Sequence, residues 1–371
     1  MGKFFSETKK KLAFGCMRLP MKDGEVDLDE FSKMIDLFIA HGFNYFDTAH
    51  GYIQEKSEPA IRKCLVERYD RSKYTITDKL TENYFNDENG VRDIFYKQLE
   101  ILGVDYLDFY LMHAQNKNNY QHFKKCHAYE TAFKLKEEGK IRRVGISFHD
   151  TPEFLDQILT EYPEIEVVQI QFNYFDYENP NVQSRRCMEV CVKHNKPVLI
   201  MEPVKGGALV NLPEEADKIL KDLNNGSNAS YAIRFAASEP QVEMVLSGMS
   251  NLAQMEDNVS YMENFIPLNE LERTAISKVV EAFKNQKLVE CTDCKYCVPG
   301  CPKHIIIPEV FKAYNIYLKN RDWHGWWAYK QYLDAGNSKA SDCIKCGKCE
   351  KVCPQHLNIR ELLVKSSETL E

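Results

Sequence analysis

An acidic side chain and a phenol lie close together near the start of the chain, in the stretch Phe46-Asp47-Thr48-Ala49-His50-Gly51-Tyr52. The apolar and aromatic run that ends at Asp47 is typical of a strand, and a turn then presents Tyr52. An acid at a strand end and a phenol on the following loop are suitable parts for a proton-transfer site. Because most such residues near strand ends are structural, the rest of the chain must decide between the two interpretations.

Two further side chains turn this pair into a chemical arrangement. Tyrosine has an ordinary pKa near 10 and gives up its proton poorly at neutral pH unless a cation is close. Lys79, which ends a predicted strand, could supply that cation, and Asp47 could hold the ammonium. His113, after the next strand, could orient a carbonyl oxygen toward Tyr52. Such a set suits protonation of an oxygen while a hydride arrives at the adjoining carbon. Later predicted strands also carry polar residues at or near their ends, at Ser147, Gln169, Glu202 and Ser247.

The elements that must position these residues alternate regularly between strand and helix. Apolar periodicity predicts strands over 12–17, 43–47, 74–79, 106–112, 141–147, 166–171, 197–201 and 242–246. It predicts helices over 28–41, 55–69, 89–102, 124–138, 152–161, 181–194, 213–223, 228–238, 251–262 and 269–285. Helices between strands force parallel pairing, and eight such units over roughly 260 residues favour a closed (β/α)8 barrel over an open doubly wound sheet. The first strand is not followed by a Gly-x-Gly-x-x-Gly fingerprint, which also weighs against a Rossmann fold.

Eight of the thirteen cysteines lie in two matching runs near the C-terminus. Each run has the form Cys-x2-Cys-x2-Cys-x3-Cys-Pro, which is the bacterial ferredoxin pattern, and the fourth cysteine of a run binds the other cluster in two-cluster ferredoxins. We therefore expect two 4Fe–4S clusters, one held by Cys291, Cys294, Cys297 and Cys353 and the other by Cys343, Cys346, Cys349 and Cys301. Structural zinc is the alternative, but the repeated third cysteine and Cys-Pro ending favour iron–sulfur.

The uneven distribution of cysteines along the chain predicts two domains. The first is a barrel over 1–268, and the second is a linker helix with a small, mostly helical ferredoxin-like domain over 269–371. The five scattered cysteines are interpreted as packing residues. Between the two runs, Trp323, Trp326 and Trp327 are expected in helices, with a core role.

The composition narrows the setting in which the protein acts. A net charge of −7 argues against nucleic acid or an anionic membrane as the main partner. No apolar run is long enough to span a bilayer, and the N-terminus lacks the apolar core of a signal peptide, so we expect a cytoplasmic protein. Met1-Gly2 with Ser6 fits the permissive myristoylation pattern, which we interpret as chance.

From residue 12 to about 262, the chain resembles the aldo-keto reductase family, in Asp47-Thr-Ala-x-x-Tyr52, in Lys79 and in Met112-His113. The resemblance implies that Tyr52 is the general acid, that Lys79 tunes it, that Asp47 holds Lys79 and that His113 positions a small carbonyl substrate. It also implies NAD(P)H extended across the barrel mouth without a Rossmann fold. The matching cofactor positions are Gly15, Cys16, Met17, Ser147, Gln169, Met201, Glu202, Lys205, Gly206, Ser247, Gly248, Gln254 and Asn258.

Several of these positions depart from the family pattern. The family's Ser-Asn pair is Ser147-Phe148 here, and Met201 stands where many members stack an aromatic ring on the nicotinamide. The loop from Glu202 to Gly207 could still cradle the pyrophosphate, with Lys205 as its counter-charge. Gly248 and Gln254 stand where members that prefer NADP often carry Lys and Arg, so the choice between NADP and NAD stays open.

Three functions follow from this combination. The first is an NAD(P)H-dependent oxidoreductase that reduces an aldehyde or ketone, with clusters that are structural or serve a separate partner. The second is an electron-transfer protein between NAD(P)H, or a bound flavin, and a ferredoxin-like partner. It needs a converter between one and two electrons, and no flavin signature is present in the sequence. The third is a non-catalytic redox-sensing subunit, which the complete catalytic set disfavours.

Overall fold

The computed structural model describes residues 4–371, so the Met1-Gly2 pattern lies outside the described residues. The chain forms two compact units. The first takes in the chain up to Asn179 together with Gln183–Pro203 and Ala229–Leu268. The second takes in Pro180–Val182, Val204–Asn228 and Asn269–Glu371. Residues 204–228, which the sequence assigns to the barrel domain, therefore fold with the cysteine-rich part of the chain.

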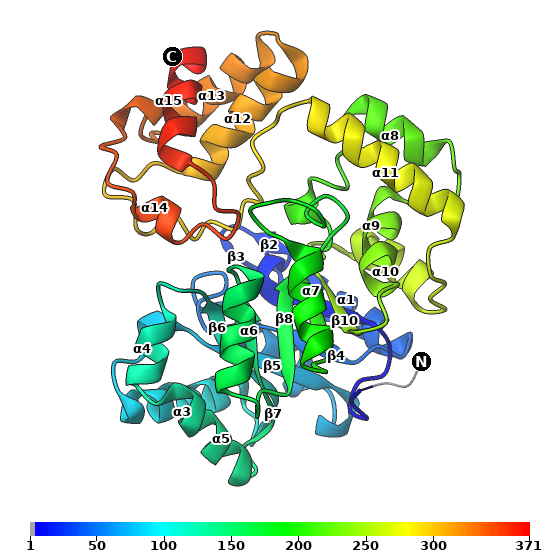
Figure 1. The fold of residues 1–371 in the computed structure, drawn as a ribbon, viewed down its shortest axis with the longest axis vertical. Helices are drawn as coiled ribbons and strands as arrows, with labels where there is room; N and C mark the ends of the chain where they lie inside the picture. Colours follow the sequence, from blue (N-terminus) through cyan, green and yellow to red (C-terminus); the bar gives the residue numbers. More distant parts are fainter. Residues whose placement is uncertain (1–3) are drawn as a thin grey trace. The chain divides into compact units, whose positions relative to one another are not determined.

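The first unit is the predicted (β/α)8 barrel. Eight parallel strands close in the order β1-β10-β9-β8-β7-β6-β5-β4 (Figure 1). Their bounds are β1 Leu12–Gly15, β4 Tyr45–Asp47, β5 Thr75–Leu80, β6 Leu107–Gln115, β7 Ile141–Phe148, β8 Val167–Gln171, β9 Val198–Met201 and β10 Val242–Ser247. Every one of them overlaps a predicted strand, because each is a short run of strand-forming residues that precedes a helix along the chain.

The helices of this unit lie around the strands and shield the barrel from water (Figure 1). They are α1 Leu28–Ala40, α2 Ser57–Ile61 with a π-helical turn Arg62–Val66, α3 Glu88–Leu102, α4 Tyr120–Lys125, α5 Ala128–Glu137, α6 Pro152–Glu161, α7 Ser184–Lys193, α9 Asn228–Ala237 and α10 Leu252–Met262. The single helix predicted over 124–138 is wrong, because His127 adopts a left-handed conformation (φ 52°) and separates α4 from α5. A two-stranded hairpin, β2 Met21–Lys22 and β3 Glu25–Val26, was not predicted.

Side chains fill the barrel interior and make it a packed core rather than a pore. Phe5, Tyr45, Phe109, Leu111 and Val167 belong to this cluster and are almost completely buried. Gly145 of β7 is needed where the neighbouring strands come close. A Cβ at this position would lie 2.5 Å from Val167 and 2.7 Å from Leu111.

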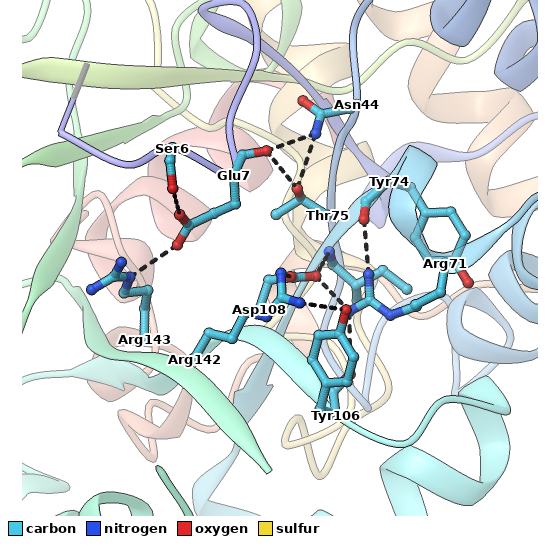
Figure 2. A network of polar contacts seen from close by, with 11 residues as sticks. Ser6, Glu7, Asn44, Arg71, Tyr74, Thr75, Tyr106, Asp108, Arg142 and Arg143 are labelled. Atoms are coloured by element: carbon cyan, nitrogen blue, oxygen red, sulfur yellow. Dashed lines mark hydrogen bonds and ion pairs between the residues drawn. The ribbon is translucent and has the colours of Figure 1, made fainter. Parts of the chain in front are cut away.

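A polar network joins the beginnings of four neighbouring strands (Figure 2). Asp108, at the start of β6, accepts hydrogen bonds from Arg71 (2.6 Å), Arg142 (2.9 Å) and the backbone N–H of Ile76 (2.9 Å). Glu7 accepts one from Arg143 (2.9 Å). Because this end of a (β/α)8 barrel serves stability rather than catalysis, we assign the network a structural role.

The second unit is helical. It contains α8 Glu214–Lys221, α11 Glu270–Asn285, α12 Ile307–Asn320, α13 His324–Asp334, α14 Lys348–Lys351 and α15 Ile359–Leu370. Helix α8 packs against α11, and α12 packs against both α13 and α15. The core around α12 includes Ile305, Val310, Phe311 and Leu363. Six cysteines of the two runs belong to this core or pack against it, namely Cys291, Cys297, Cys301, Cys343, Cys349 and Cys353.

The predicted core role of the three tryptophans is wrong. Trp323, Trp326 and Trp327 are 58%, 45% and 52% exposed, respectively, since α13 turns this face to solvent while Tyr329 and Tyr332 face the core. Within the described residues, no helix combines the length and the apolarity needed to cross a membrane.

Candidate active site and iron–sulfur centres

The four predicted catalytic residues meet at the end of the barrel where the strands finish. Asp47 ends β4, Lys79 is in β5 next to its end, and His113 follows the paired segment of β6. The register pairs Asp47 with Gly15 of β1, so the first strand also ends at this face. Tyr52 reaches the site from the loop after β4.

Lys79 is the centre of this arrangement. Its ammonium donates to Asp47 Oδ1 at 2.6 Å, to the carbonyl oxygen of Thr48 at 2.6 Å and to the hydroxyl of Tyr52 at 3.3 Å. The side chain is fully buried, and a buried ammonium persists only when it is paired and hydrogen-bonded. The same contacts that satisfy the ammonium therefore fix it beside the Tyr52 hydroxyl.

Asp47 is held on its other side by Gln169 of β8, whose amide donates to Asp47 Oδ2 at 3.0 Å. Burial raises the pKa of the Asp47 carboxyl, and the charge of Lys79 and the hydrogen bonds from Lys79 and Gln169 oppose that rise. The charged form of the carboxylate is thus favoured by both of these partners.

His113 faces the phenol from the neighbouring strand. Its ring centroid is 5.9 Å from that of Tyr52, with the rings at 72°. Its Nδ1 lies 2.7 Å from the hydroxyl of Thr81. Burial, with the nearby Lys79 and His149 charges, holds the pKa of His113 well below its usual range, so the ring is neutral at pH 7. If Thr81 donates to Nδ1, the ring proton is on Nε2 and is available to a substrate oxygen.

Sequence reasoning missed Thr81 and the carbonyl of Thr48. Thr81 comes two residues after Lys79 at the end of β5, so the two-residue period of a strand could have placed both on one face. The Thr48 carbonyl carries no signal in its residue type, because any residue provides the same backbone oxygen.

The residues predicted to hold the nicotinamide lie along the same face. Ser147 and Gln169 are register partners on β7 and β8. The hydroxyl of Ser147 is buried and has no hydrogen-bond partner within the described structure. A buried hydroxyl with no partner is costly, and a bound amide group would satisfy it. These two positions therefore fit a nicotinamide carboxamide.

The positions predicted for the rest of the dinucleotide lie at β1, β9 and β10. Ser247 bonds Asn258 at 2.7 Å, while the Gln254 side chain accepts from the Ser250 N–H at 2.8 Å. Gly248 lies against Arg18, since a Cβ there would be 3.5 Å from the Arg18 side chain. Glu202 is 3.9 Å from the same arginine. Burial raises the pKa of the Cys16 thiol strongly, which makes it inert, and Met17 and Met201 are partly buried.

Lys205 has partners within the second unit. The ammonium donates to Gln355 Oε1 at 3.1 Å and lies 3.5 Å from Glu290 Oε2. Gly206 has φ 62°, and a Cβ at this position would lie 2.3 Å from the Thr292 carbonyl oxygen. The role of Lys205 and Gly206 toward a pyrophosphate stays a prediction.

The eight cysteines of the two runs line two separate hollows. The first hollow is lined by Cys291, Cys294, Cys297 and Cys353. The second hollow is lined by Cys301, Cys343, Cys346 and Cys349. Each hollow thus takes three cysteines from one run and the fourth from the other run, which is the arrangement that the spacing predicts.

The thiols of the first hollow are close enough to act on one another. Burial raises the pKa of Cys297 strongly, and Cys294, Cys291 and Cys353 add to the rise, as does Cys349 of the second hollow. Across residues 4–371, no three His, Cys, Asp or Glu side chains converge as the ligands of a single metal ion do. A 4Fe–4S cluster is bound at its corners, so its four cysteines surround a volume, and the hollows fit such a group.

Two family models match the chain. The model described as the aldo/keto reductase family matches residues 11–281, and the model described as a 4Fe-4S dicluster domain matches residues 290–357. The second match covers all eight cysteines of the two runs, from Cys291 to Cys353.

Individual relatives share about a quarter of their residues with this chain over the matched segments. The chain is 27% identical over 182 residues to the 9,11-endoperoxide prostaglandin H2 reductase of Trypanosoma cruzi, covering 48% of this chain and 58% of that protein. It is 26% identical over 259 residues to the NAD(P)H-dependent D-xylose reductase of Scheffersomyces stipitis, covering 61% of this chain and 78% of that protein. The chain thus spans less than two thirds of the Trypanosoma protein.

Among solved structures, an aldo-keto reductase from Klebsiella pneumoniae in complex with NADPH has a TM-score of 0.61 at 18% identity. The likeness covers 76% of this chain and 96% of that one, and it concerns the fold. The first family model extends from β1 into α11 and so spans the whole barrel. The chain therefore belongs to the aldo/keto reductase family.

Proposed function

We propose that the barrel reduces an aldehyde or ketone with NAD(P)H and that Tyr52 donates the proton. The observation that carries this proposal is the fully buried Lys79 ammonium, 3.3 Å from the Tyr52 hydroxyl and 2.6 Å from Asp47. A reduced nicotinamide supplies the hydride when it is bound. The hydride pair forms the new C–H bond, the carbonyl π electrons move to oxygen, and the Tyr52 proton completes the alcohol.

Each neighbour of Tyr52 makes that proton easier to give. The Lys79 ammonium stabilises the phenolate that remains after proton transfer, which favours release of the proton. Asp47 holds the ammonium and prevents it from turning away. A neutral His113 can donate to the substrate oxygen and align it with the Tyr52 hydroxyl without adding a second cation to the site. Solvent then returns the proton to Tyr52.

The fold and the relatives support a nicotinamide cofactor. The Scheffersomyces relative is named as NAD(P)H-dependent, and the Klebsiella structure holds NADPH. The Ser147 and Gln169 positions support a nicotinamide at this face of the barrel. We propose a reduced nicotinamide dinucleotide as the hydride donor, of either the NADPH or the NADH form.

The test is the replacement Tyr52→Phe, which removes only the hydroxyl. We expect kcat/KM for carbonyl reduction to fall by about 10²–10⁴-fold, the usual contribution of a general acid. The exposed Tyr96 of α3 offers a matched control, and Tyr96→Phe should keep full activity. If Tyr52→Phe keeps more than about a tenth of the activity, the proposed acid is wrong.

We further propose that the first and second hollows each hold one 4Fe–4S cluster through the four cysteines that line them. Anaerobic purification should give about eight irons and eight sulfides per chain. Cys126→Ala, outside both runs, should keep that count, whereas Cys297→Ala should lower it. About two zincs per chain in place of iron would contradict the proposal.

A second candidate function is electron transfer between NAD(P)H, or a bound flavin, and a ferredoxin-like partner. The match to a dicluster domain favours it, because paired clusters are suited to passing single electrons. Prompt bleaching of the cluster absorbance on anaerobic mixing with NADPH or NADH would support this function, and unchanged absorbance with both would count against it.

A further inference from the structure

The segment after β9 carries a buried cation that the hydride-transfer chemistry does not use. Lys205 is 2% exposed. Its ammonium contacts Gln355 Oε1 at 3.1 Å and Glu290 Oε2 at 3.5 Å. Glu290 immediately precedes Cys291, and Gln355 follows Cys353 by two residues. These two residues are therefore close in sequence to cysteines of the first hollow.

The turn that bears Lys205 is also fixed to the wall of this hollow. Thr292 and Gln355 line the hollow, and both are almost completely buried. Gly206 lies directly against Thr292, where a Cβ would be only 2.3 Å from the carbonyl oxygen. Glycine also meets the left-handed conformation of this position without strain (φ 62°). The side chain of Lys205 and the backbone of Gly206 thus hold two separate points of the same wall.

We propose that Lys205 is a positioning residue for the iron–sulfur cluster of the first hollow and raises its reduction potential. The inference rests on the proposed function, in which this hollow holds a 4Fe–4S cluster. It assigns Lys205 to the cluster, whereas the family resemblance assigns this lysine to the pyrophosphate of the nicotinamide cofactor.

Two physical effects would both raise the reduction potential of the cluster. Reduction adds one negative charge to the cluster, and a buried ammonium nearby stabilises that charge. An ammonium is only a donor, so the Gln355 amide must present its oxygen to Lys205, which leaves the amide N–H groups on the other branch of the side chain. Hydrogen bonds from such groups to cluster sulfurs raise the reduction potential.

The carboxylate of Glu290 opposes these effects only in part. Its side chain is 35% exposed, so solvent screens its charge, whereas the ammonium of Lys205 is enclosed by protein. The net effect of the pair at the first hollow is therefore that of a positive charge.

The experiment is an anaerobic redox titration of the full-length protein, followed by electron paramagnetic resonance after iron and sulfide have been counted. In Lys205→Gln, one of the two couples should shift to lower potential, with the reduced-to-oxidised ratio at fixed potential falling about tenfold, equivalent to about 59 mV for one electron. The reduction potential of the other couple should not change. Lys205→Arg, which keeps the charge, should restore most of the potential.

Lys295 provides the matched control, because it also lines the first hollow but is exposed to solvent. Lys295→Gln removes the same charge and should shift the potential much less than Lys205→Gln. Unchanged potentials in Lys205→Gln would overturn the inference, and weaker NADP(H) binding in the same variant would then favour the pyrophosphate role.

A second variant keeps the test decisive if Lys205→Gln loses its iron. Gln355→Leu removes the amide that Lys205 orients, and it should lower the potential of the same couple. An unchanged potential in that variant would overturn the inference. Failure of the proposed cluster site is distinguishable, because the unmutated protein would then lack the expected iron before any potential is measured.

Discussion

At the scale of single residues, the site depends on one lysine that has no access to water. Lys79 is held by a carboxylate, a backbone carbonyl and a phenol, so its charge acts on Tyr52 with little solvent screening. Asp47 in turn is held by Gln169 from the far side. The residue types alone do not determine how strongly the lysine acts on the phenol, because that also depends on the burial and the partners of the ammonium. A lysine with a water-exposed ammonium would tune the phenol much less.

His113 leads to a prediction about pH. Its pKa in the folded protein lies well below the ordinary value of 6.5, mainly because of burial. As the pH falls through 6.5, the unfolded chain takes up this proton and the folded chain does not, so the free energy of unfolding decreases. We expect hydrogen exchange in β5 and β6 to speed up from pH 7 to pH 5.5, after correction for intrinsic exchange rates.

The variant His113→Gln should show a smaller change over the same pH range, because glutamine takes up no proton. His127, which is outside the site, provides the control, and His127→Gln should keep the pH response of the unmutated barrel. An equal response in His113→Gln would mean that other groups cause the loss of stability.

The meeting of Asp47, Tyr52, Lys79 and His113 at one end of the barrel could be predicted, because their types and spacing are local signals at strand ends, and their catalytic roles stay a proposal. Thr81 and the Thr48 carbonyl could not be singled out in the same way, since a threonine at a strand end and a backbone oxygen occur everywhere. The contacts of Lys205 could not be predicted either, because Gln355 is 150 residues away along the chain and no periodicity connects the two residues.

At the scale of elements, the regular alternation of strands and helices made the barrel predictable. Helix α6 begins and ends where expected, at Pro152 and Glu161, because a proline is favoured in the first turn of a helix. The break between α4 and α5 depends on a single left-handed residue, His127, and apolar periodicity continues across it. The hairpin of β2 and β3 has only two residues a strand, which is too short for a periodic signal.

The network at the strand beginnings leads to a prediction about stability. Asp108 is 1% exposed and joins β6 to Arg71 before β5 and to Arg142 of β7 (Figure 2). Asp108→Asn removes the charge from these hydrogen bonds and should lower the stability of the barrel by about 1.5–3 kcal/mol. Thermal unfolding followed by far-ultraviolet circular dichroism measures the effect.

Asp105 gives a control for Asp108, because it lies just before β6 and is exposed. Asp105→Asn should unfold at nearly the same temperature as the unmutated protein. If both variants shift the unfolding transition equally, the buried network contributes nothing beyond a change in surface charge.

At the scale of the whole molecule, the chain consists of a barrel unit and a helical unit with different sources of stability. The barrel has a large apolar core of its own. In the helical unit, Cys297 and Cys349 are core members, and Cys291, Cys301, Cys343 and Cys353 pack against them. We infer that the stability of the helical unit depends on bound iron–sulfur, since small metal-binding folds commonly couple binding to folding.

Removal of the iron should therefore affect the two units differently. We expect faster hydrogen exchange in α12 and α15 after anaerobic chelation, with unchanged protection in β5 and β6. The three tryptophans of the chain are Trp323, Trp326 and Trp327, so tryptophan fluorescence reports on the helical unit alone. Equal loss of protection in both units would contradict independent sources of stability.

The division of the chain into units could be predicted only in part. The cysteine runs mark the region after residue 269, but residues 204–228 join the same unit through contacts such as Asn225 with Glu272 at 2.9 Å. The exposure of the tryptophans was also unexpected, because aromatic residues are usually buried. Both outcomes depend on long-range packing, which local sequence patterns do not encode.

The central claim is direct hydride transfer in the barrel, and isotope labelling tests it most directly. The reduced nicotinamide is labelled with deuterium at C4, in each of its two stereochemical forms, and the alcohol product is analysed by mass spectrometry. We predict that one of the two forms transfers deuterium to the former carbonyl carbon. A product without deuterium from either form would show that electrons and protons arrive separately, and would contradict the account.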